Sequence, residues 1–228
     1  MKTIVVSVGG SMIVPDKVDY NFLVSLRKAV EAIVKKSKIV ICTGGGSTAR
    51  EYISILRKAG ADNHSQDIAG IDATRLNARL VASFLSAGKK IKANQEIPKS
   101  LNEIKALLGA NDCVVCGGLG PGKTSDGTTA EIAGFLGADT IYNMTNVKGL
   151  YTKDPRKHRD AKFIPLISHE GFRDMMVKVK EKPGQHFVLD SEAERITREK
   201  NMEVVILQGA QNLQKAVEGK KFEGTIVE

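Results

Sequence analysis

The sequence contains no tryptophan, four tyrosines, seven phenylalanines and three cysteines among its 228 residues. An odd number of cysteines, and so few, does not fit a disulfide framework and is typical of a protein in a reducing cytoplasm. The scarce aromatic residues are not interleaved with basic ones, which disfavours recognition of nucleic acid by base stacking. The composition therefore predicts a cytoplasmic protein with no disulfide scaffold and no nucleic-acid partner.

A long hydrophobic run is also missing. The longest stretch without a charge, Thr3–Pro15, contains two glycines and is too short for a helix that spans a membrane. No small-residue cleavage site follows the N-terminal apolar run, so we expect no signal peptide. These absences predict a protein that has no membrane partner.

What is present is an ordinary globular composition with a positive charge. Apolar residues make up 42% of the chain and charged residues 26%, which excludes global disorder. The length suits one large domain or two small ones. Thirty-four Lys and Arg residues against 26 Asp and Glu give a net charge of +8, which favours anionic partners. The total charge alone leaves nucleic acids, lipids and small phosphates open.

Patterns of buried strands alternate with amphipathic helix patterns along the chain. The expected strands are Thr3–Val8, Lys38–Cys42, Asp112–Cys116, Thr140–Thr145, Glu203–Leu207 and Thr225–Val227. The first expected helix begins after Asp19. Further helices are expected over about 47–58, 67–84, 101–109, 128–136, 169–176 and 190–200, with a loop at 146–163 and a small helix before the last strand. Because such alternation is typical of βαβ units, we predict an α/β fold, a three-layer αβα sandwich with a largely parallel central sheet.

Glycine-rich turns follow three of the expected strands, at Val8–Ser11, Thr43–Ser47 and Cys116–Asp126. In a parallel sheet these turns fall at the same carboxyl edge, where ligands usually bind. Glycine lets the backbone approach a ligand closely, and free N–H groups at the start of the next helix favour a phosphate. Three such turns on one edge predict a site for a polyphosphate or for two phosphates.

The third turn also matches a different phosphate-binding motif. Residues 117–124 fit the P-loop pattern G-x-x-x-x-G-K-[ST], in which Lys123 would reach the β- and γ-phosphates and Thr124 would hold Mg²⁺. That motif needs an acidic residue at the end of a hydrophobic strand, and the strands that end near Thr145 and Gln208 have none. The P-loop hypothesis also leaves the other two glycine turns unexplained, so we do not favour it.

Cys113 and Cys116 have the spacing of a redox or zinc pair. Residues i and i+3 of a strand point to opposite faces, so the two sulfur atoms are not expected to meet. No second pair of ligands exists to complete a zinc site. We expect buried structural thiols, and no metal site built from protein side chains.

Several segments of the sequence resemble the amino acid kinase family, and within it the archaeal-type uridylate (UMP) kinases. They are Val8–Ser11, Thr43–Arg50, Asp67–Ile71, Thr74–Ala78, Pro121–Asp126 and Thr145–Pro155, with a weaker echo from Leu189 to Ile196. The most specific are the triple glycine followed by Ser-Thr-Ala-Arg, and Asp-Ile-Ala-Gly-Ile. The resemblance implies one amino acid kinase domain over residues 1–228, with the acceptor side and the phosphate turns in about 1–138 and the ATP side in about 139–228.

This resemblance implies transfer of the γ-phosphoryl group of ATP to UMP, which gives UDP for pyrimidine nucleotide biosynthesis, with Mg²⁺ as the ion. It implies ATP contacts from Gly10, Ser11, Gly46, Arg50, Thr145, Asn146, Tyr151 and Asp154. It implies UMP contacts from Gly45, Asp67, Leu119, Gly120, Pro121, Gly122, Lys123, Thr124 and Ser125, with Asp67 accepting hydrogen bonds from ribose hydroxyls. It also implies a cytoplasmic homo-oligomer, a hexamer built from dimers.

Lys123 and Asp126 are the predicted catalytic residues. Lys123 is expected to touch the transferring phosphate, because this chemistry needs positioning and positive charge more than covalent help. Asp126 matches a family position that orients charged groups in the site, and it fits the N-cap of the next helix equally well. The chain departs from many family members at Ser7, where they carry a lysine, so the source of charge on the first strand stays open.

Other functions are compatible with the same motifs. Another phosphotransferase of the family, with a carboxylate, carbamate or isopentenyl phosphate acceptor, would leave the acidic Asp67 without a ribose to bind. A non-catalytic nucleotide- or oxyanion-binding protein of the same fold is suggested by Ser7 in place of lysine. A phosphotransfer assay with several acceptors in parallel separates these functions.

Overall fold

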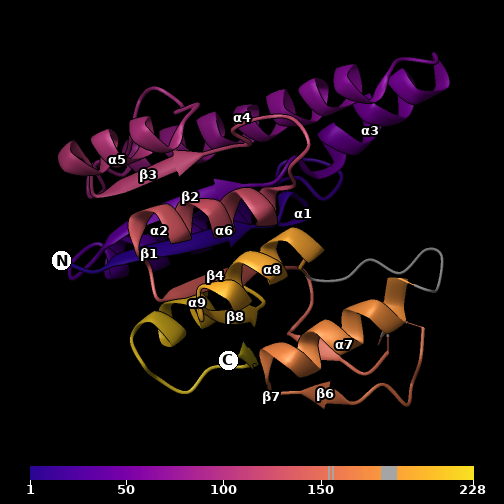
Figure 1. The fold of residues 1–228 in the computed structure, drawn as a ribbon. Helices are drawn as coiled ribbons and strands as arrows, with labels where there is room; N and C mark the ends of the chain where they lie inside the picture. The colour runs from indigo at the N-terminus through magenta and orange to yellow at the C-terminus, as the bar shows by residue number, and fades with distance from the viewer. Residues whose placement is uncertain (154, 156, 181–188) are drawn as a thin grey trace.

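The chain forms one seven-stranded sheet between layers of helices, in a computed structural model that describes residues 1–153, 155, 157–180 and 189–228 (Figure 1). The strand order is β3-β2-β1-β4-β8-β9-β7. The bounds are β1 Thr3–Val8, β2 Lys38–Thr43, β3 Cys113–Cys116, β4 Thr140–Met144, β7 Leu166–Ile167, β8 Glu203–Leu207 and β9 Gly224–Val227. Strands β3, β2, β1, β4 and β8 are parallel, and β9 runs antiparallel to β8. The predicted, largely parallel sheet is confirmed.

The helices lie on both faces of this sheet. Their bounds are α1 Gly10–Ile13, α2 Tyr20–Ile33, α3 Gly46–Lys58, α4 Asn63–Ala87, α5 Leu101–Ala110, α6 Ser125–Leu136, α7 His169–Lys180, α8 Ser191–Glu199 and α9 Ala210–Val217. One hydrophobic cluster joins the sheet to α2, α4 and α9, and a second joins it to α5, α6, α7 and α8. Two cores on opposite faces of one sheet make the three-layer sandwich that the sequence predicts.

Strand β1 contributes to both cores because successive side chains of a strand point to opposite faces. Ile4, Val6 and Val8 belong to the core on the α2 and α4 side, and Val5 belongs to the core on the α6 side. By the same alternation, Ser7 faces the α6 side. A polar side chain is therefore buried between the centre of the sheet and α6, with 1% of its surface exposed.

The cysteines follow the same rule, which confirms that the Cys113 and Cys116 side chains do not meet. Cys113 packs in the core beside α4, whereas Cys116 and Cys42 pack in the core beside α6. All three thiols are free and buried. Burial raises the pKa of the Cys113 thiol, so it stays protonated and acts as a small apolar side chain.

Several short elements differ from the sequence prediction. Residues 146–163 are not only a loop, because β5 (Leu150–Tyr151) pairs antiparallel with β6 (Phe163–Ile164). The sequence pattern does not predict helix α1 (Gly10–Ile13) or strand β7 (Leu166–Ile167) either. Elements of two to four residues carry too little periodicity to be recognised in a sequence.

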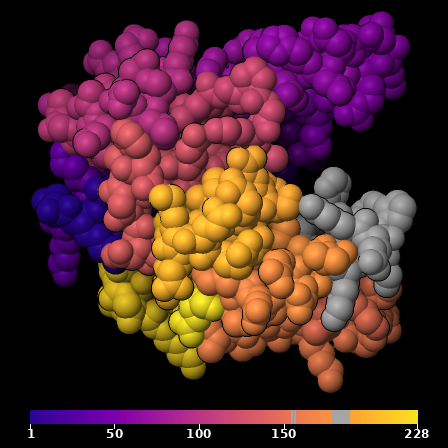
Figure 2. Space-filling view, in the orientation of Figure 1, coloured from indigo at the N-terminus to yellow at the C-terminus, as the bar shows by residue number. Residues whose placement is uncertain are grey.

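Two helices also begin earlier than the sequence predicts. Helix α4 begins at Asn63 because the Asp62 carboxylate accepts a hydrogen bond from Ser65 N, and α6 begins at Ser125. Helix α4 is the longest helix in the described part of the chain, and its N-terminal part runs beside α3. The pair projects beyond the rest of the molecule, as Figures 1 and 2 show.

Candidate active site

The three glycine turns lie together at the carboxyl edge of the parallel strands. They follow β1, β2 and β3, which are neighbours in the order β3-β2-β1. Gly9 N donates to Met144 O at 2.9 Å, and Gly44 N donates to Val8 O at 3.0 Å. The ends of β4, β1 and β2 are therefore joined by backbone hydrogen bonds at the edge where phosphate ligands bind in such sheets.

The first two turns touch through their backbones, which only glycine allows. A Cβ atom on Gly10 would lie 2.6 Å from the carbonyl carbon of Gly44, and one on Gly44 would lie 2.6 Å from Gly10 N. Gly46 adopts φ +65°, and a Cβ there would lie 2.7 Å from the carbonyl oxygens of Gly10 and Val14. The turns therefore form one continuous glycine backbone surface, to which a phosphate can come close.

Arg50 brings a positive charge to this surface. Its Nη1 donates to Ser11 Oγ at 3.1 Å, and its Nη2 donates to Pro15 O at 3.3 Å. Arg50 lies on α3, one turn after Gly46, so the helix carries the guanidinium across to the first glycine turn. The structure thus brings together Gly10, Ser11, Gly46 and Arg50, which the resemblance assigns to ATP.

Helix α4 holds the second and third turns in place. Asn77 Nδ2 donates to Gly44 O at 2.8 Å, and Thr74 Oγ1 accepts from Gly118 N at 2.7 Å. Thr43 Oγ1 donates to Thr74 O at 2.9 Å, which ties the end of β2 to the same helix. The sequence motifs assign no role to Thr43, Thr74 or Asn77. Asn77 is a buried polar residue of α4 that lies beside the buried Ala73 and Ala78. A polar residue among apolar ones is the sequence signal that could have revealed its hydrogen-bonding role.

The acceptor loop predicted at Leu119–Ser125 contacts Asp67. The Asp67 carboxylate accepts a hydrogen bond from Gly122 N at 3.0 Å, and Gly122 has φ +77°. Asp67 is exposed near the start of α4, so its second oxygen can accept from a ligand. Two sequence segments that the resemblance assigns to UMP, Asp67 and this loop, are therefore side by side.

Lys123 is held by an acidic residue of the next helix. Its Nζ lies 2.8 Å from Glu131 Oε2, and each side chain is about one third exposed. Exposed ion pairs of this kind contribute about 1 kcal/mol or less, so a phosphate can compete for the lysine. A role of Lys123 at the transferring phosphate stays a prediction.

Asp126 is not the N-cap of α6, which corrects one of the two sequence hypotheses. Thr124 is the cap, because its hydroxyl accepts from Gly127 N at 3.1 Å. Asp126 lies in the first turn, and its Oδ1 accepts from Ser7 Oγ at 2.9 Å. Asp126 therefore faces the central strand β1 instead of closing the helix end.

The Asp126 carboxyl has an unusual ionisation. Burial raises its pKa to about 6, the hydrogen bond from Ser7 opposes this rise, and the nearby charge of Asp190 adds to it. Asp190 caps α8 and also accepts from Thr124 Oγ1, so it links the first turns of α6 and α8. No sequence motif assigns a role to Asp190, although it lies in the weak family echo from Leu189 to Ile196.

The residues predicted to hold the ATP adenosine follow β4. Thr145 N donates to Leu207 O at 2.9 Å, and Gln208 Nε2 donates to Asn146 O at 3.1 Å. Tyr151 lies in the β5–β6 hairpin, with its ring edge against Phe163 at a centroid distance of 5.4 Å. Thr145 and Asn146 are thus at the carboxyl edge, beside the first glycine turn. Asp154 lies outside the described residues.

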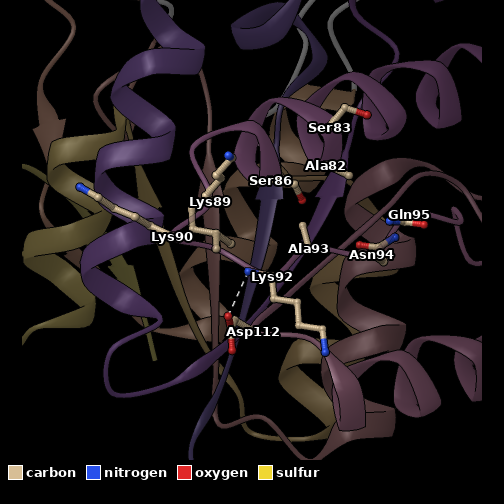
Figure 3. A pocket seen from close by; sticks show the side chains of 11 residues that line it. Ala82, Ser83, Ser86, Lys89, Lys90, Lys92, Ala93, Asn94, Gln95 and Asp112 are labelled. Carbon is tan, nitrogen blue, oxygen red and sulfur yellow. Dashed lines mark hydrogen bonds between the residues drawn. The ribbon is translucent and has the colours of Figure 1, made fainter.

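Two surface hollows occur at the other end of the sheet. One of about 580 Å³ lies between the end of α4 and the start of β3, and its lining includes Lys89, Lys90, Lys92 and Asp112 (Figure 3). In the figure, Asp112 accepts a hydrogen bond from the backbone of Lys92. A second, of about 600 Å³, shares Lys90 and Asp112. Neither hollow includes a residue of the glycine turns.

The described part of the chain lacks two features that mark other classes of protein. No helix there is both long enough and apolar enough to cross a membrane. Those residues also contain no group of three or more His, Cys, Asp or Glu side chains that could hold a metal ion.

This fold and this edge define a protein that binds phosphorylated ligands on glycine backbone at the ends of parallel strands. The chain belongs to the amino acid kinase family, whose model matches residues 2–208. The family assignment replaces the P-loop hypothesis. The Thr124 hydroxyl, which that hypothesis assigns to Mg²⁺, instead caps α6 and bonds to Asp190.

Similar proteins of known name cover the whole chain. It is 35% identical to a uridylate kinase of Methanocorpusculum labreanum, with 100% of this chain and 96% of the relative covered. It is 36% identical to a uridylate kinase of Pyrococcus abyssi, with 99% of each covered. The crystal structure of uridylate kinase from Archaeoglobus fulgidus superposes with a TM-score of 0.86 at 31% identity, over 100% of both chains. The Ureaplasma parvum UMP kinase, at 22% identity and a TM-score of 0.83, shares the fold.

Proposed function

We propose that this protein transfers the γ-phosphoryl group of ATP to UMP and so produces UDP for pyrimidine nucleotide biosynthesis. The observation that carries the proposal is the hydrogen bond between Asp67 and Gly122 N, which places an acidic side chain over the predicted acceptor loop. An acidic group beside a phosphate site is useful for a ribose hydroxyl and unfavourable for a carboxylate acceptor. The full-length relatives named uridylate kinase support the same acceptor.

The geometry suits an in-line transfer between two bound nucleotides. Phosphoryl transfer passes through a loose transition state, so catalysis depends on alignment and on positive charge around the transferring group. The glycine surface would hold the donor phosphates through backbone N–H groups such as those of Gly10 and Gly46, and the Arg50 guanidinium would neutralise charge. UMP would lie between Asp67 and the loop Leu119–Ser125, with its phosphate toward the same surface. ATP adenosine would lie against Thr145, Asn146 and the β5–β6 hairpin.

The deciding experiment is a phosphotransfer assay with labelled ATP. UMP, CMP, AMP, GMP, glutamate and aspartate are offered in parallel, and we expect labelled UDP as the main product. Label on an amino acid but not on UMP would mean a different phosphotransferase of the family. Nucleotide-dependent thermal stabilisation without any transfer would mean a binding protein of the same fold.

Mg²⁺ is the ion we expect with ATP. Mg²⁺ usually keeps waters and binds through substrate phosphates with few protein carboxylates, so the ion would arrive on the nucleotide. Chelation with EDTA should abolish transfer, and added Mg²⁺ should restore it.

We also propose that the protein is a cytoplasmic homo-oligomer, a hexamer built from dimers. Three large apolar side chains on the projecting α3–α4 pair support a contact between copies, because Tyr52, Ile55 and Leu76 are 58%, 59% and 62% exposed. Burial of such side chains between subunits is favourable. Light scattering of the purified protein measures the subunit number, and a monomer would contradict the proposal.

A further inference from the structure

Ser7 is a buried hydroxyl in the middle of the sheet. It lies on β1, two residues before the first glycine turn, with Cys42 and Asn143 as its register partners on the neighbouring strands. A buried hydroxyl is costly unless it is hydrogen-bonded, and Ser7 Oγ donates to Asp126 Oδ1 at 2.9 Å. The bond joins the central strand to the first turn of α6, at the edge where the glycine turns meet.

The two carboxylates near this edge are not equally satisfied. Asp190 accepts from Thr124 Oγ1 and from three backbone N–H groups, those of Gly127, Glu192 and Ala193. For Asp126, Ser7 Oγ is the one donor recorded within the described ranges. A carboxylate has about four acceptor positions, so Asp126 keeps capacity for groups that arrive with the substrates.

The charges around Asp126 make this single donor important. Asp190, on the packed helix α8, is the charged neighbour that acts on it, and its negative charge disfavours ionisation of Asp126. None of the ion pairs found in the described part of the chain joins a Lys or Arg to Asp126. A hydroxyl donor to the carboxylate is therefore the contact that favours its charged form.

We propose that Ser7 is a positioning residue for phosphoryl transfer, whose hydroxyl fixes the Asp126 carboxylate at the glycine edge and leaves its other oxygen for the cations that accompany the phosphates. Ser7 itself touches no substrate in this scheme. The inference rests on the proposed function, because it assigns Asp126 a place in that same transfer. Loss of the hydroxyl should misalign the carboxylate without removing the nucleotide contacts.

The kinetic test compares Ser7→Ala with Ser7→Thr. Ser7→Ala should lower kcat roughly tenfold, since a hydrogen bond to a charged group is among the stronger ones, and should change KM for ATP and UMP less than about twofold. Ser7→Thr keeps the hydroxyl and should restore most of kcat. Thr140→Val removes a buried hydroxyl from the neighbouring strand β4 at the far end of the sheet, and should leave kcat unchanged. An equal loss in Thr140→Val, or no loss in Ser7→Ala, overturns the proposal.

A second readout does not depend on the acceptor. Carboxyl carbon NMR of the full-length protein follows the titration of Asp126, and its pKa should be higher in Ser7→Ala than in the wild type, because a donor to the charged form has been lost. An unchanged titration would contradict the contact even if UMP is not the substrate. Conversely, a shifted titration with no labelled UDP would refute the proposed function and keep the Ser7–Asp126 link.

A double-mutant cycle completes the test. If Ser7 acts through Asp126, Ser7→Ala should have little further effect on kcat in the Asp126→Asn background. Additive losses would show that Ser7 acts on catalysis by another route and would overturn the proposal.

Discussion

Single residues without a side chain set the closest contacts of the site. Gly10, Gly44 and Gly46 bring two turns together at distances that a Cβ atom would block. At Gly46, which adopts φ +65°, the backbone conformation also favours glycine. Gly60 shares only the conformation, since it has φ +78° and open space where a Cβ atom would lie.

Gly46→Ala and Gly60→Ala should separate these two effects. An alanine at positive φ costs about 1–2 kcal/mol, so both variants should lose some stability. At Gly46 the methyl group also meets two carbonyl oxygens, so we expect a larger loss of stability and near-complete loss of phosphotransfer. Gly60→Ala should keep its kcat. Denaturant unfolding and the UMP assay measure both quantities, and equal behaviour of the two variants would contradict the steric argument.

Lys123 provides a second prediction at this scale. Removal of a charged group that meets the transferring phosphate typically costs about 10²-fold or more in kcat, so Lys123→Ala should fall in this range if the lysine leaves Glu131 for the phosphate. Glu131→Gln removes the competing partner and should not lower kcat. Lys105→Ala, on α5 with its ammonium over Phe135, is the matched control for loss of a nearby cation. Full turnover of Lys123→Ala would refute its assigned role.

At the scale of elements, α4 connects parts of the site that are distant in sequence. Thr74 Oγ1 accepts a hydrogen bond from Gly118 N, and the Thr74 carbonyl accepts one from Thr43 Oγ1. Asn77 Nδ2 donates to Gly44 O. The same helix carries Asp67, the proposed ribose contact, near its start. One rigid helix thus spaces the phosphate turn, the acceptor loop and the acidic side chain relative to one another.

Thr74→Val and Thr74→Ser should test this spacing role. Valine has nearly the same shape but leaves Gly118 N without its acceptor, which costs about 1–3 kcal/mol when the group is buried. We expect a raised KM for UMP in Thr74→Val with a smaller change in KM for ATP, because the acceptor loop begins at this bond. Thr74→Ser keeps the hydroxyl and should remain close to the wild type. Equal effects on both KM values would contradict a local role in the acceptor loop.

The long elements and the glycine edge could be read from the sequence, while the connections between them could not. Strands such as β1 and β2 are mostly apolar, and glycine turns follow them in sequence, so the apolar pattern and the glycine positions are enough to predict them. The Ser7–Asp126 bond joins residues 119 positions apart, and no local pattern reports such a pair. Helix α1 and strands β5 to β7 were missed because two to four residues show no period. The sequence leaves two roles open for Asp126, and the cap at Thr124 excludes one of them, the N-cap of α6.

At the scale of the whole molecule, a buried histidine connects stability to pH. His169, at the start of α7, is 9% exposed, and burial lowers its pKa below 6.5, with Glu194 opposing the shift. A histidine held neutral in the folded state binds fewer protons than in the unfolded state. Its contribution to stability is therefore present above about pH 6.5 and is lost as the pH falls below that value.

His169→Leu should remove this part of the pH dependence. The difference in Tm between pH 8 and pH 5 should be smaller in His169→Leu than in the wild type. In a chain of this size, a stability change of 1 kcal/mol shifts Tm by about 2–4 °C. Asp126, with its raised pKa, acts in the opposite direction between about pH 4 and 6, so the comparison with the variant is the informative measurement. His64→Leu, at an exposed position, is the control. An unchanged pH dependence in His169→Leu would contradict the assignment.

The position of β9 in the sheet has a consequence for synthesis on the ribosome. Strand β7 pairs only with β9 in the described sheet, yet Leu166–Ile167 leaves the ribosome long before Gly224–Val227 does. Strands β1, β2 and β3 can already pair when β7 appears, but β7 must wait for a partner made much later. The hairpin and helix α7 around the proposed adenosine side should therefore be the last region to acquire protection, and nascent chains stalled before β9 should be cleaved there first by a protease.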